Sequence, residues 1–515
     1  HGSRRMAHRA VAINETPRWP GRIVVGLVLV VLFGPLIAVL WRAEGIAALS
    51  PADVSAIWFT VWQAALSALI SIAFAIPVAR ALARRQFRGR QALITLLGAP
   101  FLLPVIVAIL GLLAVFGRAG ILNGFLAALG LPDVSIYGAH GVILAHVFFN
   151  MPLAVRLILQ GWVAIPSERF RLAASLNAPI WQVLEKPMLR NVLPGAFIVI
   201  FLISLTSFAV ALTLGGGPRA TTIELAIYQA MRLSFDLAGG ATLTLVQIAI
   251  CALVALLAFA ITAPDAMGRG LDRVVARWDG SLWGDALWIT AAALFLLVPL
   301  IMVIWRGVPG LFDLPVSVWS AAARSVVIAM AAAGLTLALA LALALRGGRW
   351  AMIIGTLPMA FSGLVLGTGL FLIAFPVVNP AKLALPVTAL VNSLMALPFV
   401  MRALVPAVAQ IDAQFGPLAG ALGLRGWARV RIVLLPRLRR PLGFGGGIAA
   451  ALSMGDLGVI TLFSTGERST LPHEMYLLMG AYRMDAAAGA ALVLVSLSLG
   501  LFWLFDQGGR MDADA

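Results

Sequence analysis

Long apolar runs, separated by short polar segments, make up most of the chain. Each run has about the 20 residues that an α-helix needs to cross a bilayer, and a helix satisfies its own backbone polar groups in lipid. The pattern therefore predicts an all-α polytopic membrane protein with about twelve spanning helices. We expect the spans at residues 23–40, 57–78, 93–116, 141–159, 192–214, 241–262, 286–305, 325–345, 351–375, 385–405, 442–463 and 486–505.

The composition excludes an ordinary soluble enzyme. Of the 515 residues, 62% are apolar and 11% are charged, whereas about 25% of the residues in a soluble domain are charged. The net charge of +16 comes almost entirely from arginine. Because these arginines are scattered between apolar runs, they indicate membrane orientation and not a nucleic-acid partner. The single Cys251 excludes an internal disulfide and a multi-cysteine metal site.

Basic residues concentrate in alternate connections between the predicted spans. They collect in the N-terminal tail and at 80–90, 169–190, 269–277 and 425–440, and the intervening connections hold fewer. Cytoplasmic loops of membrane proteins carry such an excess. We therefore predict that both termini are cytoplasmic. The first residues, His1-Gly2-Ser3, resemble the remnant of an expression tag.

The two halves of the sequence resemble each other. Residues 150–156 read NMPLAVR and residues 396–402 read ALPFVMR, an offset of 246, and Tyr228 matches Tyr476 at an offset of 248. With six spans in each half, the copies enter the membrane with the same polarity, so they are parallel repeats with a pathway expected at their seam. We predict two transmembrane domains, 23–264 and 285–508, with a cytoplasmic linker at 265–284 and cytoplasmic tails at 1–22 and 509–515.

A segment between the tenth and eleventh spans has the features of a docking element. Small residues at 419–421 permit close helix approach, and Gly423 is suited to a left-handed turn. The residues that follow mix Trp427 with basic side chains such as Arg425, and Pro436 precedes the next span. We predict a short helix on the cytoplasmic face that offers one side to a partner. A basic loop resting on lipid headgroups is the alternative.

This segment resembles the EAA loop of ABC importer permeases. In that family the loop forms a coupling helix that fits a cleft on the ATP-binding subunit. The first half carries a degraded copy in which Asn177 replaces the glycine, and Pro187 follows it more closely than Pro436 follows Gly423. The resemblance implies EAA loops near 166–190 and 412–440. It implies coupling to the ATPase through Ala173, Ala174, Asn177, Ala419, Gly420, Gly423 and Arg425.

Further stretches resemble the fused permeases of bacterial thiamine importers. They are HVFFNMP at 146–152, GGGPRATTIELAIYQ at 215–229 and SMGDLGV at 453–459. The resemblance implies a type I importer-like permease of the bacterial inner membrane that imports thiamine, and its phosphates, by alternating access. It implies as partners two copies of an ABC ATPase, which would hold ATP and Mg, and a periplasmic thiamine-binding protein. Fused permeases for iron(III) or polyamines share this architecture and remain alternatives.

The sequence contains no catalytic constellation. No G-x-x-x-x-G-K-[S/T] segment occurs, so we expect no enzymatic activity, no cofactor and no metal in this chain, and energy from a separate ATPase. An ion-coupled secondary transporter is the alternative from another class. It would need ionisable groups within the spans, for which the chain offers chiefly Asp456 and His146.

Two further sets of residues are candidates for contact with cargo or its carrier. Asp456, at the outward half of the eleventh span, is matched by Phe208 in the first copy and could meet a cationic cargo, or accept hydrogen bonds where helices pack. We predict a pathway lined by Asp456, Phe208, Ser207 and His146. We predict contact with the binding protein, or loop anchoring as the alternative, for Arg219, Glu224, Tyr228, Glu474 and Tyr476.

Overall fold

The computed structural model describes residues 19–42, 48–98, 103–260, 274, 281–464 and 468–510, and every regular element among them is helical. The first half contains α1 (Trp19–Arg42), α2 (Pro51–Arg84), α3 (Arg90–Leu96), α4 (Val105–Phe116), α5 (Ile121–Ala128), α6 (Ala139–Ala164), α7 (Ser167–Ser175), η2 (Trp181–Glu185), α8 (Lys186–Leu205), α9 (Phe208–Leu214), η3 (Pro218–Ala220), α10 (Ile223–Tyr228), η4 (Gln229–Ser234) and α11 (Leu237–Ala260). The second half contains α12 (Leu282–Gly310), η5 (Leu311–Asp313), α13 (Val316–Arg346), α14 (Gly348–Thr356), η6 (Leu357–Ala360), α15 (Gly363–Ala374), η7 (Pro380–Leu383), α16 (Ala384–Ala421), α17 (Gly426–Arg429), η8 (Val430–Leu434), α18 (Leu435–Met454), α19 (Gly458–Phe463), α20 (Leu471–Gly480) and α21 (Met484–Arg510).

The helices of the described residues are long and apolar enough for a polytopic membrane protein. Eleven candidate spans meet the length and hydropathy expected of a crossing helix. A twelfth is formed by Trp350–Ala360 and Gly363–Ala374, which are bent by 84° at a short break. The predicted all-α polytopic fold is therefore confirmed. Most of the predicted linker, together with residues 1–18 and 511–515 of the predicted tails, lies outside the described residues.

Four of the predicted spans are interrupted and not continuous. In the expected span 93–116, α3 and α4 are separate helices. In the expected span 351–375, the chain bends by 84° between Trp350–Ala360 and Gly363–Ala374. In the expected spans 192–214 and 442–463, α8 ends before α9 and α18 ends before α19. Pro104 precedes α4, and Ser362 caps α15 by accepting a hydrogen bond from the Val365 N–H at 3.0 Å. Hydropathy could not locate these breaks because the composition stays apolar across them.

Paired features recur in the two halves. The π-helical turns η2 and η8 lead into α8 and α18, which have 20 residues each and begin 249 positions apart (435 − 186). Thr60 Oγ1 of α2 accepts a hydrogen bond from the Ile223 N–H at 2.8 Å, and Ser325 Oγ of α13 accepts one from the Leu471 N–H at 2.8 Å. In each half, a hydroxyl oxygen thus accepts a hydrogen bond from the first N–H of a short helix, α10 or α20. This correspondence supports the predicted tandem repeat.

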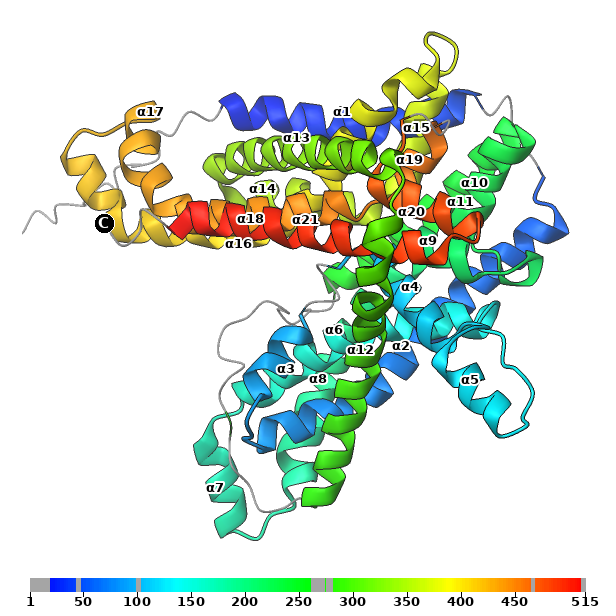
Figure 1. The fold of residues 1–515 in the computed structure, drawn as a ribbon. Coiled ribbons are helices and arrows are strands. Elements are labelled where there is room, and N and C mark those ends of the chain that lie inside the picture. The colour runs from blue at the N-terminus through cyan, green and yellow to red at the C-terminus, as the bar shows by residue number, and fades with distance from the viewer. Residues whose placement is uncertain are drawn as a thin grey trace, which may run out of the picture.

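The first helix of each half packs against the other half. Helix α1 lies along α13 and α15, and its Val28 and Leu32 belong to a core built largely from the second half (Figure 1). Helix α12 lies along α2 and α4, and its Ala292 and Leu296 belong to the core of the first half. The first helix of each half thus lies against the other half, and α12 also packs along α21 of its own half.

Candidate functional site

Helices α7 and α16 end in the same backbone motif. Asn177 has φ +49° and Gly423 has φ +67°, so the left-handed turns expected of these residues are confirmed. In the first half, the Ala178 N–H donates to the Ala173 carbonyl at 2.9 Å, and the equivalent bond in the second half joins Leu424 to the Ala419 carbonyl at 2.9 Å. This pairing is a Schellman motif, in which a left-handed residue ends a helix and satisfies its last carbonyls.

The predicted coupling residues divide into an anchored side and an exposed side. Ala173 and Ala419 are buried against their bundles. The other five predicted coupling residues are exposed: Ala174, Asn177, Gly420, Gly423 and Arg425. Each motif therefore presents a turn with small or short side chains on a surface that a partner can approach. No finding tests the coupling role itself, which stays a prediction.

The short separate helix expected after Gly423 is not formed. Helix α16 runs without interruption from Ala384 to Ala421, and α17 has four residues that continue through η8 into α18. Pro436 stands in the first turn of α18, as Pro187 does in α8. The docking surface is therefore made by the end of α16 and its turn, and α17 is the beginning of the next span.

An ion pair with one buried and one partly exposed partner lies behind each turn. Arg429, which is buried, bonds Asp412 at 2.6 Å across the turn of the second half. In the first half, Glu185 is completely buried, pairs with Arg80 at 2.7 Å and accepts a hydrogen bond from Trp162 Nε1 at 3.2 Å. These contacts connect each turn region to the helices behind it.

The docking turns lie far from the place where the short helices gather. Figure 1 shows α7 and α17 at the far ends of the two bundles, away from α9, α10, α19 and α20, which lie together on the other side of the molecule. In this region the breaks of the two halves meet. A Cβ on Gly455 would lie 3.1 Å from Pro104 Cα of the first half, and a Cβ on Gly458 would lie 3.8 Å from the Phe208 ring.

Asp456 lies at this seam, in the break between α18 and α19. Its Oδ1 accepts a hydrogen bond from the Gly458 N–H at 3.3 Å, and its buried Oδ2 has no hydrogen-bond partner among the described residues. Helices α8 and α18 end 249 positions apart, at Leu205 and Met454. When the two halves are aligned on these helix ends, Asp456 corresponds to Ser207, and not to Phe208 as the sequence match predicts. Ser207 and Phe208 form the equivalent break in the first half, so three of the four predicted pathway residues lie at the paired breaks.

His146, the fourth predicted pathway residue, lies in a polar network inside the first half. Its Nδ1 donates to Gln63 Oε1 at 2.8 Å, and Gln63 Nε2 donates to the Ser204 carbonyl at 3.3 Å. Asn150 Nδ2 donates to Ser204 Oγ at 3.0 Å in the same network. In this conformation His146 is buried among α2, α6 and α8. Its hydrogen-bond partner, Gln63, belongs to the core of the first half, and His146 does not line the seam.

Glu224 and Glu474 are not on the outer surface. Glu224 is completely buried, accepts from Gln247 Nε2 at 3.1 Å and lies close enough to the Ser362 hydroxyl of the second half to interact with it. Glu474 is also buried and accepts from Ser469 Oγ at 2.9 Å. In this conformation neither carboxylate is exposed, and their contact with a binding protein stays a prediction, with loop anchoring as the alternative. Arg219 is exposed.

The α10 carboxylate has an altered proton affinity. Glu224 lies outside the candidate spans, and burial raises the pKa of its carboxyl to about 8, against smaller opposing effects of the Ser362 and Gln247 hydrogen bonds. Tyr228 and Tyr476 are half-buried nearby, and burial raises the pKa of each phenol.

Sequence reasoning missed two residues that join the halves. Arg232 Nη2 donates to the Ser464 carbonyl at 2.8 Å, and the Ser362 hydroxyl interacts with the Glu224 carboxyl. Arg232 had a signal that could have been used, since it is a single arginine in a connection with few other basic residues. Ser362 had none, because a serine within an apolar stretch is common in membrane helices.

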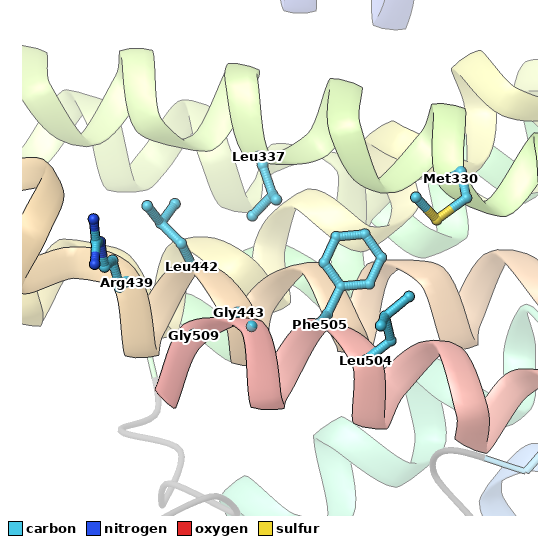
Figure 2. A pocket seen from close by; sticks show the side chains of 9 residues that line it. Met330, Leu337, Arg439, Leu442, Gly443, Leu504, Phe505 and Gly509 are labelled. Atoms are coloured by element: carbon cyan, nitrogen blue, oxygen red, sulfur yellow. The ribbon is translucent and has the colours of Figure 1, made fainter. Parts of the chain in front are cut away.

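A groove of about 400 Å³ opens elsewhere, on the second half. Figure 2 shows it between α13, α18 and α21. It is lined by Met330, Leu337, Arg439, Leu442, Gly443, Leu504, Phe505, Gly508 and Gly509. Because the first half contributes no lining residue, this groove is not the seam. Among the described residues, no group of three His, Cys, Asp or Glu side chains is arranged to hold a metal ion.

The chain is similar over nearly its whole length to curated permeases. No protein-family model matches it. It is 38% identical to the thiamine transport system permease protein ThiP of Salmonella typhimurium, covering 95% of this chain and 97% of that protein. For ThiP of Escherichia coli the identity is 38%, with 96% and 98% covered.

A shorter relative matches one half of the chain. The molybdenum transport system permease protein ModB of Mycobacterium bovis is 27% identical, and the match covers 94% of ModB but 47% of this chain. A complete single permease thus corresponds in length to half of the present protein. Given the extent and identity of the matches to ThiP, the chain belongs to the family of thiamine transport system permease proteins, the membrane subunits of ABC transport systems.

Proposed function

We propose that this permease carries thiamine, and thiamine phosphates, from a periplasmic binding protein across the bacterial inner membrane into the cytoplasm. The observation that carries the proposal is the identity of 33–38% to permeases named for thiamine transport, over 89% or more of this chain. The excess of basic residues beside α7 and α17 supports cytoplasmic termini and a cytoplasmic position for both docking turns.

Energy would come from two copies of a separate ABC ATPase, which would bind ATP and Mg. Two features support two copies: the Schellman turns after α7 and α16 are equivalent, and each has an exposed face. Closure of an ATPase dimer would draw the turns together, and the ion pairs behind them would pass this movement to the bundles. The seam would then open outward to receive cargo, and hydrolysis would restore the inward-facing state. This is alternating access driven by differential binding of two states.

Substitution of Gly423 tests the coupling step. Gly423→Glu places a charged side chain on the exposed turn at φ +67°, and we expect it to lower ATPase co-purification and thiamine uptake at least tenfold. Gly130→Glu is the matched control. Gly130 has φ +69°, and a Cβ at either glycine would meet nothing within 4 Å, so both variants carry the same backbone strain. Normal uptake by membrane-inserted Gly423→Glu would contradict the coupling assignment.

The substrate is tested with the complete transporter in proteoliposomes. We expect thiamine-loaded binding protein to stimulate ATP hydrolysis and to support uptake of labelled thiamine. Stimulation by iron- or polyamine-loaded receptors and none by the thiamine receptor would overturn the substrate. Uptake that persists without the ATPase and stops with an uncoupler would instead favour an ion-coupled carrier.

A further inference from the structure

We propose that Asp456, Phe208 and Tyr228 form a binding site within the seam for an organic cation with an aromatic ring. The proposal rests on the proposed function and names the part of the cargo that the membrane subunit itself recognises, the positively charged thiazolium. The site is composite, since the carboxylate belongs to the second half and both aromatic rings belong to the first.

The carboxylate of Asp456 has no counter-ion in the described part of the chain. Its Oδ1 accepts a hydrogen bond from the Gly458 N–H at 3.3 Å, the Val459 N–H and the Asn392 side chain also interact with the carboxylate, and its buried Oδ2 has no hydrogen-bond partner among the described residues. The buried carboxylates Glu185 and Asp285 differ, because each pairs with arginine. A lone carboxylate within a membrane span is costly, and a passing cation would offset that cost.

Gly458 leaves space between the carboxylate and the nearest ring. A Cβ at this position would lie 3.7 Å from Asp456 Oδ1 and 3.8 Å from Phe208 Cδ1. A single point is therefore in van der Waals contact with both groups. In any residue except glycine that point would be filled, so the sequence keeps the carboxylate and the ring open to a common neighbour.

The aromatic wall extends beyond Phe208. Its ring and that of Tyr228 lie edge to face with centroids 5.4 Å apart, and Tyr228 is half-buried. Aromatic faces attract cations by about 0.5–2 kcal/mol, and a ring on the cargo gains from edge-to-face contact. The positive charge of Arg232 opposes the rise that burial causes in the pKa of Tyr228, and the guanidinium donates a hydrogen bond to the Ser464 carbonyl at 2.8 Å.

Movement of the halves would change this site. Since Phe208 lies on α9 of the first half and Asp456 lies in the break between α18 and α19 of the second, opening of the seam would separate the ring from the carboxylate, and closing would bring them together. The site thus binds a cation most favourably at one stage of the cycle and releases it at another, as a transport site requires.

Direct binding to the permease–ATPase complex in nanodiscs tests the proposal without the binding protein. Equilibrium dialysis would compare thiamine with its isostere in which a neutral thiophene replaces the thiazolium. We expect the isostere to bind the wild-type complex at least tenfold more weakly than thiamine.

Asp456→Asn keeps an oxygen for the Gly458 N–H but removes the charge. We expect it to weaken thiamine binding at least tenfold and to change binding of the isostere less than threefold. Asp313→Asn, at an exposed aspartate, is the control and should change neither.

Three outcomes would overturn the site: equal binding of thiamine and isostere by the wild-type complex, equal loss of both ligands in Asp456→Asn, or no thiamine binding at any concentration. The comparison of the two ligands on the wild-type complex holds even where the variant does not fold. A complete transporter that takes up thiamine, but whose membrane subunit does not discriminate the charge, would refute this site and leave the proposed function intact. Absence of uptake would refute the function.

Discussion

At the scale of single residues, Glu224 is a buried carboxyl close to residues of both halves. Its Oε1 accepts a hydrogen bond from Gln247 of its own half, the Ser362 hydroxyl of the other half interacts with it, and its second oxygen, Oε2, has no hydrogen-bond partner among the described residues. A neutral carboxyl suits this position better than a charged one, because burial penalises the charge.

The raised pKa of Glu224 predicts a pH-dependent stability. Between its ordinary value of 4.5 and about 8, the folded protein holds a proton that the unfolded chain releases. The stabilisation is therefore complete below 4.5 and is lost as the pH rises to about 8. We expect the melting temperature in detergent to fall from pH 5 to pH 8.5, and Glu224→Gln, which cannot ionise, to reduce this fall. We expect the free energy of unfolding to fall by about 1 kcal/mol or more over this pH range, because each pKa unit corresponds to about 1.4 kcal/mol. Equal pH profiles of wild type and variant would contradict the prediction.

The residues that could be predicted from the sequence are those whose backbone or context is unusual. Gly423 and Asn177 were found because left-handed turns favour Gly and Asn, and the structure has both in that conformation. The burial of Glu224 was not predicted, because nothing in its own short helix, α10, indicates that other helices cover it. Burial depends on what packs over a helix, and that information is distributed over distant parts of the chain.

At the scale of elements, close helix contacts depend on glycine. A Cβ on Gly111 of α4 would lie 2.7 Å from the Pro299 carbonyl oxygen and 3.1 Å from Val303 Cγ2, both of α12. Only the absence of a side chain lets the two helices approach at this point, which lies on the contact that holds α12 to the first half.

Enlargement of Gly111 is expected to weaken that contact. Overpacking a tight interface costs about 1–3 kcal/mol, so Gly111→Leu should lower the melting temperature of the purified permease by several degrees. Gly124→Leu is the matched control, because a Cβ on this α5 glycine meets nothing within 4 Å. Equal melting temperatures of the two variants would contradict the role of Gly111 in this packing.

Helix existence was predictable, whereas helix continuity was not. All twelve apolar stretches correspond to helical segments, since length and apolar character decide whether a segment crosses. The breaks at 206–207, 357–362 and 455–457 depend on partner helices and hydroxyl groups, which satisfy the freed backbone groups. Hydropathy does not record those partners.

At the scale of the whole molecule, the side opposite the docking turns is closed by polar contacts between the halves. Arg232 donates to the Ser464 carbonyl at 2.8 Å, and a hydrogen bond from a charged group contributes about 1.5–3 kcal/mol. Opening of the seam on this side requires that this bond be broken.

Removal of the Arg232 guanidinium should therefore favour the open state. We expect Arg232→Met to raise ATP hydrolysis by the complete complex several-fold in the absence of binding protein. The exposed Arg219→Met serves as the control and should leave this basal rate unchanged. An unaltered basal rate in Arg232→Met would show that the contact does not restrain opening.

The packing of α1 and α12 against opposite halves also determines how the chain must assemble. Helix α1 leaves the ribosome first, yet the helices against which it rests, α13 and α15, are made only some three hundred residues later. During synthesis the N-terminal helix waits in lipid without its final neighbours, and the first bundle keeps a vacant side until α12 is inserted. Covalent linkage of the two units keeps the late helices at a high effective concentration near the early one, so that incorrect pairing with other membrane proteins is suppressed.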